Sequence, residues 1–210
     1  GVIGGLSYGT TVEELTNAYG AIANGGVFND AYLISEIVAA DGTPVYKHEE
    51  DPQRVVSEQS AYLMTDMLKT VITDGSGSSI RSQFKSYGDI PVVGKTGTTQ
   101  NWGDVWFQGY TPDITLGVWV GYEKQANALS TEGRKHARSI WAEIMNVVTE
   151  ARPELFPTKE FAKPEDIVSK TVSSVSGMLP TELTREAGKL VTDIFNRKCI
   201  PTDEDDALVK

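Results

Sequence analysis

The sequence predicts a mixed fold of the α+β type, in which an antiparallel sheet lies between helices. Two segments with the apolar spacing of a helix, 12–24 and 136–151, flank three extended runs. The runs are 92–99, 104–111 and 114–122, and their connections are so short that consecutive strands should pair antiparallel. Helices before and after such a sheet favour an arrangement in which both of its faces are covered.

The first helix is predicted over residues 12–24. Thr11 and Glu14 match a capping box, in which the two side chains satisfy free backbone N–H groups at the start of a helix. Gly25 and Gly26 are typical of a helix end. The apolar face is expected to be buried, with Leu15, Ala18, Tyr19 and Ile22 on it.

A hairpin and a second helix are predicted before the extended runs. Residues 32–39 are typical of a strand, Asp41-Gly42 of a tight turn, and 44–46 of the returning strand. Ser57 can cap a helix that runs through Ile72. Its expected buried residues are Ala61, Met64, Leu68, Val71 and Ile72.

The runs 104–111 and 114–122 are expected to form central strands, and 92–99 is expected to pair beside 104–111 with its other edge exposed. The third helix, 136–151, should bury Ile140, Trp141, Ile144, Met145 and Val148. We therefore assign 1–152 to one domain. Residues 153–210 are expected to form a proline-spaced linker and an acidic tail that packs partly on this domain, with a short strand at 167–175 and solvated carboxylates at 203–206.

Composition excludes several classes of function. The net charge is −10 and the only basic cluster is 133–138, which argues against nucleic-acid binding. No apolar stretch approaches the length of a membrane span, so any anchor is expected outside this sequence. His48 and His136 have no partners at metal-ligand spacing, and neither a metal nor another cofactor is expected.

The segment Lys95-Thr96-Gly97-Thr98-Thr99 carries the clearest chemical signal. It sets a cation, three hydroxyls and a residue without a side chain along one predicted strand. A lysine on a strand offers a fixed positive charge to an anionic ligand, and a glycine there permits the close approach of another backbone. An extended peptide could then pair with the strand through main-chain hydrogen bonds. The segment therefore predicts a binding surface for a peptide that ends in a carboxylate.

Together with its surroundings, this K-T-G triplet resembles the C-terminal half of the transpeptidase domain of class A, bifunctional penicillin-binding proteins. The segments that carry the resemblance are Gly94 to Gln100, Asp104 to Pro112, Gly117 to Tyr122, Leu15 to Gly26 and Met64 to Leu68. The resemblance implies the same helix-covered antiparallel fold as the penicillin-recognising serine enzymes. It departs from the family at 134–139, where a charged stretch replaces the usual Gly/Ala-rich run with its proline.

The resemblance also implies roles for the triplet. The backbone N–H of Thr98 would be one of two oxyanion-hole donors, and the hydroxyls of Thr96 and Thr98 would lie near the ligand carboxylate. Lys95 to Thr99 would form the substrate-binding strand. Asp104 and Trp106 are possible members of the cleft wall; the alternatives are that Asp104 only caps its strand and that Trp106, like Phe107, belongs to the core.

The nucleophile of such an enzyme is missing from this sequence. The only S-x-x-K, Ser82 to Lys85, lies in a connecting stretch shortly before Lys95, and we interpret both residues as solvated loop residues. None of the seven asparagines completes an S-x-N motif, although Ser7-Tyr8-Gly9 imitates one. The chain alone is therefore predicted to be inactive and to need an upstream fragment that carries both motifs.

The function implied by the resemblance is that of a peptidoglycan D,D-transpeptidase. The complete enzyme would acylate its serine with the D-Ala-D-Ala end of a stem peptide, release D-Ala and pass the acyl group to a neighbouring amine. β-Lactams would trap the acyl-enzyme, and the parent would be anchored at the extracytoplasmic face of the bacterial membrane. The alternatives are a serine β-lactamase or D,D-carboxypeptidase, which use water as acceptor, and a non-catalytic β-lactam sensor.

Overall fold

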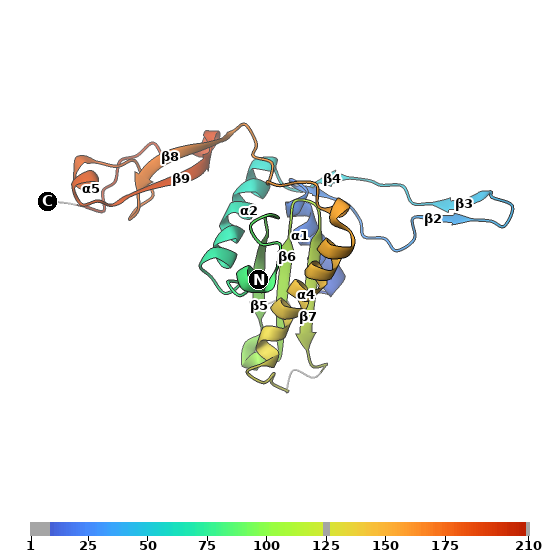
Figure 1. Ribbon diagram of the computed structural model, residues 1–210. Helices are drawn as coiled ribbons and strands as arrows, with labels where there is room; N and C mark the ends of the chain where they lie inside the picture. The colour runs from blue at the N-terminus through green and yellow to red at the C-terminus, as the bar shows by residue number, and fades with distance from the viewer. Residues whose placement is uncertain (1–8, 124–126, 209–210) are drawn as a thin grey trace. The chain divides into compact units, whose positions relative to one another are not determined.

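The computed structural model of the protein describes residues 9–123 and 127–208 (Figure 1). The chain divides into two compact units, Gly1–Phe161 and Ala162–Lys210. The domain boundary predicted from the sequence lies after residue 152, whereas in the structure the following nine residues group with the first unit. Their side chains explain this grouping, because Thr158 binds Asp113 and the ring of Phe161 packs edge-on against Tyr110.

A three-stranded antiparallel sheet forms the centre of the first unit. Its strands are β5 (Val93–Thr98), β6 (Asp104–Tyr110) and β7 (Thr115–Gly121), in the order β5-β6-β7. The register places Thr96 opposite Phe107 and Phe107 opposite Val118. The three predicted strands and their antiparallel pairing are confirmed. Only β6 is central in the described part of the chain, so the expectation that 114–122 would also be central is wrong.

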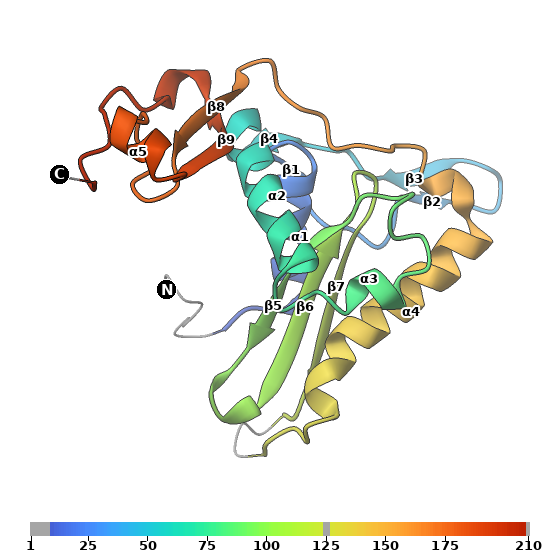
Figure 2. The same cartoon turned by 60° about the vertical axis from the view of Figure 1, so that its left-hand side comes forward.

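Helices cover both faces of this sheet, as predicted (Figure 2). They are α1 (Val12–Ala23), α2 (Glu58–Thr73), α3 (Ile80–Gln83) and α4 (His136–Ala151). Successive side chains of a strand point to opposite faces. On β6, Phe107 therefore meets α4 through Trp141, and Tyr110 meets α2 on the other side through Thr65.

The larger core lies between α4 and the sheet. Trp141 is completely buried, and its indole packs edge-on against Phe107 and Phe84 at centroid distances of 5.4 and 5.8 Å. On the other face, the Tyr110 hydroxyl lies 2.9 Å from the Thr65 hydroxyl. Burial raises the pKa of Tyr110 to about 12, so this phenol stays protonated.

The capping predictions are confirmed. Thr11 and Glu14 form the capping box, with the Thr11 N–H donating to the Glu14 carboxylate at 2.8 Å, and Ser57 caps α2. The predicted buried faces are correct only in part, because Ala18, Met64, Ile140 and Ile144 are exposed. Ala21, Thr65, Ala137 and Ala142 are buried in their place, since small side chains let each helix approach the sheet.

The predicted hairpin is present but short. It consists of β2 (Glu36–Val38) and β3 (Pro44–Lys47), and Gly42 supplies the left-handed conformation of the turn with φ +87°. The two-residue strands β1 (Val27–Phe28) and β4 (Gln53–Arg54) pair at its base. Short 3₁₀ turns occur at Gln100–Trp102, Gly133–Lys135, Pro153–Leu155 and Arg197–Cys199.

The second unit contains a two-stranded antiparallel sheet, β8 (Ile167–Ser173) and β9 (Leu190–Asn196), and the short helix α5 (Glu182–Glu186). The strand β8 was predicted, whereas β9 was not. Asp205 is 4% exposed and accepts a hydrogen bond from the Thr184 hydroxyl at 2.8 Å, so the prediction that all carboxylates of the acidic end are solvated is wrong for this residue.

We predict that amide hydrogen exchange in β7 alternates along the strand. Thr111 N–H donates to the Ile114 carbonyl, and by antiparallel alternation the N–H groups of Val118 and Val120 then point to β6. These two amides should exchange among the slowest in the first unit, and the intervening Trp119 amide should exchange faster. Exchange measured by NMR with the same rate at all three amides would contradict this strand arrangement.

We also predict that Asp205 stabilises the second unit. Hydrogen bonds from the hydroxyls of Ser173 and Thr184 lower the pKa of Asp205 to about 2 from an ordinary value of 3.8. A depressed pKa gives a contribution that is present above about pH 4 and is lost as the pH falls through about 2. Asp205→Asn should therefore destabilise the unit at pH 7 but progressively less toward pH 2.

Thermal melting followed on the amide resonances of β8 and β9 measures this difference. The matched control is Asp206→Asn, which removes an exposed carboxylate next to the buried one. A difference between wild type and Asp205→Asn that stays constant from pH 7 to pH 2 would show that the carboxylate charge has no such role.

Candidate functional site

The strand β5 presents its free edge at the K-T-G triplet. The Thr99 N–H donates to the Asp104 carbonyl at 3.2 Å, which fixes the alternation of hydrogen bonds between β5 and β6. The backbone groups of Lys95 and Gly97 therefore point to β6, and those of Thr96 and Thr98 point away from it. No further strand pairs with β5 within 9–123 and 127–208. The Thr98 N–H is thus directed to an edge that an extended ligand can reach.

The side chains of the triplet lie on both faces of β5. Lys95 is exposed, and its ammonium group donates to the Thr96 carbonyl at 2.8 Å. Thr98 is exposed as well. The structure therefore brings a positive charge, a carbonyl and an N–H donor to one accessible edge, which is a surface that can pair with a peptide and attract its carboxylate.

Gly97 lies opposite the indole of Trp106. A Cβ added at Gly97 would be 3.1 Å from the Trp106 Cβ, which is a tight contact. The glycine in this strand therefore accommodates a neighbouring tryptophan on β6. A larger residue at position 97 would push the indole away and disturb the pairing of the two strands.

Two residues that sequence reasoning missed support Thr96. The Ser76 hydroxyl lies 2.6 Å from the Thr96 hydroxyl, and the Ser76 carbonyl accepts a hydrogen bond from the Arg138 guanidinium at 3.0 Å. Ser76 precedes Thr96 by 20 residues and Arg138 follows Ser76 by 62. The only sequence signal for Arg138 was its position in the charged stretch that departs from the family pattern.

Asp104 and Trp106 begin β6 beside the triplet. The Asp104 N–H donates to the Thr99 hydroxyl at 3.0 Å, and one Asp104 carboxylate oxygen is buried without a partner among the described residues. Trp106 is half-buried and packs edge-on against Trp119 at 6.4 Å, whereas Phe107 is fully buried in the core. A role of Asp104 and Trp106 in the cleft wall stays a prediction.

The connection between β5 and β6 is held in a defined conformation. Asn101 and Trp102 adopt left-handed backbone angles, with φ 58° and 57°. Such conformations are strained for residues other than glycine and need support from their surroundings. Here the Arg134 guanidinium lies 4.0 Å from the Trp102 ring centroid, and the Leu129 N–H donates to the Trp102 carbonyl at 2.8 Å.

The S-x-x-K segment differs from the prediction in its secondary structure. Ser82 lies in the short helix α3 and not in a loop, although its side chain is exposed as expected. Its hydroxyl donates to the Ser79 carbonyl at 3.1 Å. The Lys85 N–H donates to the Asn146 side chain at 2.8 Å, and Lys85 is also exposed. Ser7 and Tyr8 of the S-x-N-like segment lie outside the described residues.

Across the described ranges, none of the helices combines the length and the apolar character needed to cross a bilayer. The same ranges contain no cluster of three or more histidine, cysteine, aspartate or glutamate side chains that could hold a metal ion.

Comparison with protein families identifies both units. A family model for the penicillin-binding protein transpeptidase domain matches residues 3–146. A second, for the C-terminal domain of penicillin-binding protein 1A, matches residues 163–210.

Individual relatives agree with this result. The chain is 31% identical over 206 residues to penicillin-binding protein 1A of Clostridium novyi, covering 97% of this chain and 23% of that protein. It is 30% identical over 222 residues to penicillin-binding protein 1A/1B of Bacillus subtilis, covering 95% and 23%. The chain therefore spans about a quarter of the length of these relatives.

The fold is also that of solved penicillin-binding proteins. Penicillin-binding protein 1A from Haemophilus influenzae superposes with a TM-score of 0.77 over 93% of this chain and 33% of that one, at 21% identity. Penicillin-binding protein 3 from Mycobacterium tuberculosis gives 0.56 over 74% and 38%, also at 21%. The sequence resemblance is confirmed: the chain belongs to the penicillin-binding protein transpeptidase family and corresponds to the C-terminal part of a class A member.

Proposed function

We propose that this chain supplies the substrate-binding strand of a peptidoglycan D,D-transpeptidase. The observation that carries the proposal is the free edge of β5, where the Thr98 N–H points away from β6 and the Lys95 ammonium lies beside the Thr96 carbonyl. An extended stem peptide can pair with this edge by main-chain hydrogen bonds. Lys95 and the hydroxyls of Thr96 and Thr98 would hold its terminal carboxylate, with Gly97 and Thr99 completing the strand.

The chemistry would proceed in two transfers. A serine from the upstream part of the parent attacks the carbonyl between the two D-Ala residues, and its proton passes through a base to the leaving D-Ala amine as the C–N bond breaks. An amine on a neighbouring peptidoglycan chain then attacks the ester carbonyl and loses a proton, and the serine oxygen takes up a proton as its bond to the acyl carbon breaks. The Thr98 N–H would stabilise the oxyanion in both tetrahedral intermediates. β-Lactams would enter by the first step and remain on the serine.

Several partners follow from this proposal. The chain would act with the upstream segment that carries S-x-x-K and S-x-N, with peptidoglycan stem peptides and with β-lactams. The parent would be anchored at the extracytoplasmic face of the membrane through a segment outside this sequence. The match of residues 163–210 to a penicillin-binding protein 1A domain favours this function over a single-domain β-lactamase or D,D-carboxypeptidase and over a sensor.

We predict that the chain by itself is not labelled covalently by a fluorescent penicillin. It has no S-x-N, and the hydroxyl of its only S-x-x-K serine donates to a backbone carbonyl of its own helix turn. Addition of the upstream fragment, refolded together with the chain, should restore labelling that survives boiling. Stoichiometric labelling of the chain alone, abolished by Ser82→Ala, would overturn the assignment of Ser82.

In the intact parent, we predict that Lys95→Ala slows acylation by an amount equivalent to about 2–4 kcal/mol, because a fixed charge at the substrate edge is lost. Thr98→Ala should have a smaller effect, since only the hydroxyl is removed and the N–H donor remains. Lys85→Ala, at another exposed lysine, is the matched control. The measurement is second-order acylation by a chromogenic β-lactam with thermal melting of each variant.

The melting temperatures of all three variants should stay close to that of the parent, because the side chains of Lys95, Thr98 and Lys85 are exposed. The proposal fails if Lys95→Ala acylates at the parental rate. It also fails if the loss of activity follows a collapse in melting temperature, since Lys95 would then be a structural residue.

A further inference from the structure

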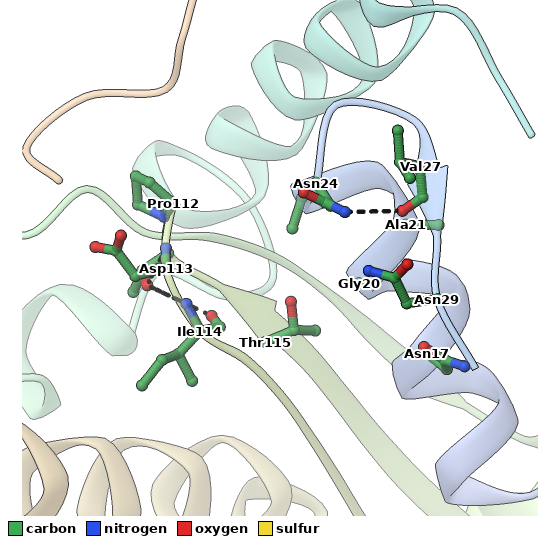
Figure 3. A pocket seen from close by; sticks show the side chains of 12 residues that line it. Asn17, Gly20, Ala21, Asn24, Val27, Asn29, Pro112, Asp113, Ile114 and Thr115 are labelled. Carbon is green, nitrogen blue, oxygen red and sulfur yellow. Dashed lines mark hydrogen bonds between the residues drawn. The ribbon is translucent and has the colours of Figure 1, made fainter. Parts of the chain in front are cut away.

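A separate cavity of about 310 Å³ lies in the first unit, between α1 and the turn that joins β6 to β7 (Figure 3). Asn17, Gly20 and Asn24 line it from the helix and its end, Asn29 from the following segment, and Thr115 from the start of β7. The register pairs Val105 with Thr98 at one end of β6, whereas the cavity adjoins the other end. The K-T-G residues pair with Gln108, Phe107 and Trp106, whereas the cavity begins at Thr111. At about 3.4 Å per residue, the two sites are roughly 10–17 Å apart along the sheet.

Half of the six polar side chains that line the cavity are amides. Three asparagine side chains and the Thr115 hydroxyl can both donate and accept hydrogen bonds. The Asn24 amide nitrogen is engaged with the Val27 carbonyl at 3.1 Å. The Asn29 side-chain oxygen is buried and accepts no hydrogen bond from the described residues. That oxygen is covered by protein atoms, so a ligand in the cavity would meet the Asn29 amide nitrogen, which donates no hydrogen bond to the described residues.

The charge of the cavity favours a neutral ligand. Its lining residues include no lysine or arginine, so nothing there would neutralise a phosphate or a carboxylate. Its one carboxylate, that of Asp113, already accepts hydrogen bonds from the Thr158 N–H at 3.1 Å and the Thr158 hydroxyl at 2.6 Å. Val27 and Ile114 add apolar surface on which a methyl group can rest.

Gly20 keeps the wall of the cavity open. Glycine is a poor residue for the interior of a helix, and a Cβ at this position would have room. It would lie 3.9 Å from the Asn17 side-chain oxygen and 4.0 Å from the Thr115 hydroxyl, both ordinary contacts. Packing within the protein therefore does not require a glycine here, whereas space for a ligand would explain it.

We propose that this cavity binds an N-acetylhexosamine unit of a glycan chain. Sugar hydroxyls and the acetamido group donate and accept hydrogen bonds, which suits amides that do the same, and the acetyl methyl suits Val27 and Ile114. None of the lining residues is aromatic, so affinity depends on hydrogen bonds and is expected in the millimolar range.

The glycan in question would be the sugar strand of peptidoglycan, and this identification rests on the proposed function. A strand held in the cavity would raise the local concentration of its peptide branches near the β5 edge. The cavity would thus act as a positioning site for the polymer and would take no part in bond making.

The test is an NMR titration of the full chain with N,N′,N″-triacetylchitotriose. Saturable shifts are expected at the side-chain amides of Asn17 and Asn29. Maltotriose, which lacks acetamido groups, should bind more weakly, and triglycine amide should not bind. Asn29→Ala should weaken the affinity about five- to tenfold through one lost hydrogen bond. Gly20→Leu should fill the cavity and abolish binding, while Asn127→Ala, at an exposed asparagine, should have no effect.

Melting temperatures show that each variant is folded before its affinity is compared. The proposal is overturned if the wild-type chain shows no saturable shifts, or if folded Gly20→Leu binds as well as wild type. Binding of triglycine amide in place of the sugar would make the cavity a peptide site. The titration needs no serine nucleophile, so its failure is independent of the acylation measurements that test the transpeptidase function.

Discussion

The packing of one indole between α4 and the sheet determines much of the first unit. Trp141 is fully buried against Phe107 and Phe84, and its ring N–H donates to the Leu116 carbonyl at 3.0 Å. One side chain therefore links α4 to β6, to β7 and to the segment after α3. β6 pairs with both β5 and β7, so its position sets the register of both pairs. If different packing of Trp141 let β6 slip by one residue against β5, the Thr98 N–H would no longer point to the open edge.

The side chains of β6 alternate between the two faces of the sheet, and the two faces have different surroundings. Residues of β6 that meet α4 form the larger core, and those on the other face meet α1 and α2 near Tyr110 and remain half-exposed near Trp106. The candidate binding edge thus belongs to β5, whose neighbour β6 is fixed from both faces. A ligand that pairs with β5 would meet a backbone whose geometry is already set, which limits the entropy lost on binding.

Local sequence signals predicted the elements of this fold well. The capping box at Thr11, the cap at Ser57 and the closely spaced strands each depend on residues near one another in the chain. The contact of Ser76 with Thr96 and the burial of Asp205 depend on segments that are distant in the sequence. The spacing of apolar residues along the chain does not indicate such contacts. Met64 was misassigned for a related reason. The Tyr110 hydroxyl selects Thr65 for the buried position, and that partner is 45 residues away.

The edge of β5 that has no partner strand among the described residues also affects how the chain behaves in concentrated solution. A strand with free N–H and carbonyl groups is a template on which a second molecule can add its own strand and begin an aggregate. Lys95 opposes this, because an antiparallel pair of two such edges would bring two ammonium groups close together. The net charge of −10 adds repulsion between whole molecules. Lys95, for which we propose a role in binding a carboxylate, would therefore also keep identical edges apart. The chain should self-associate more readily in high salt, where both repulsions are screened.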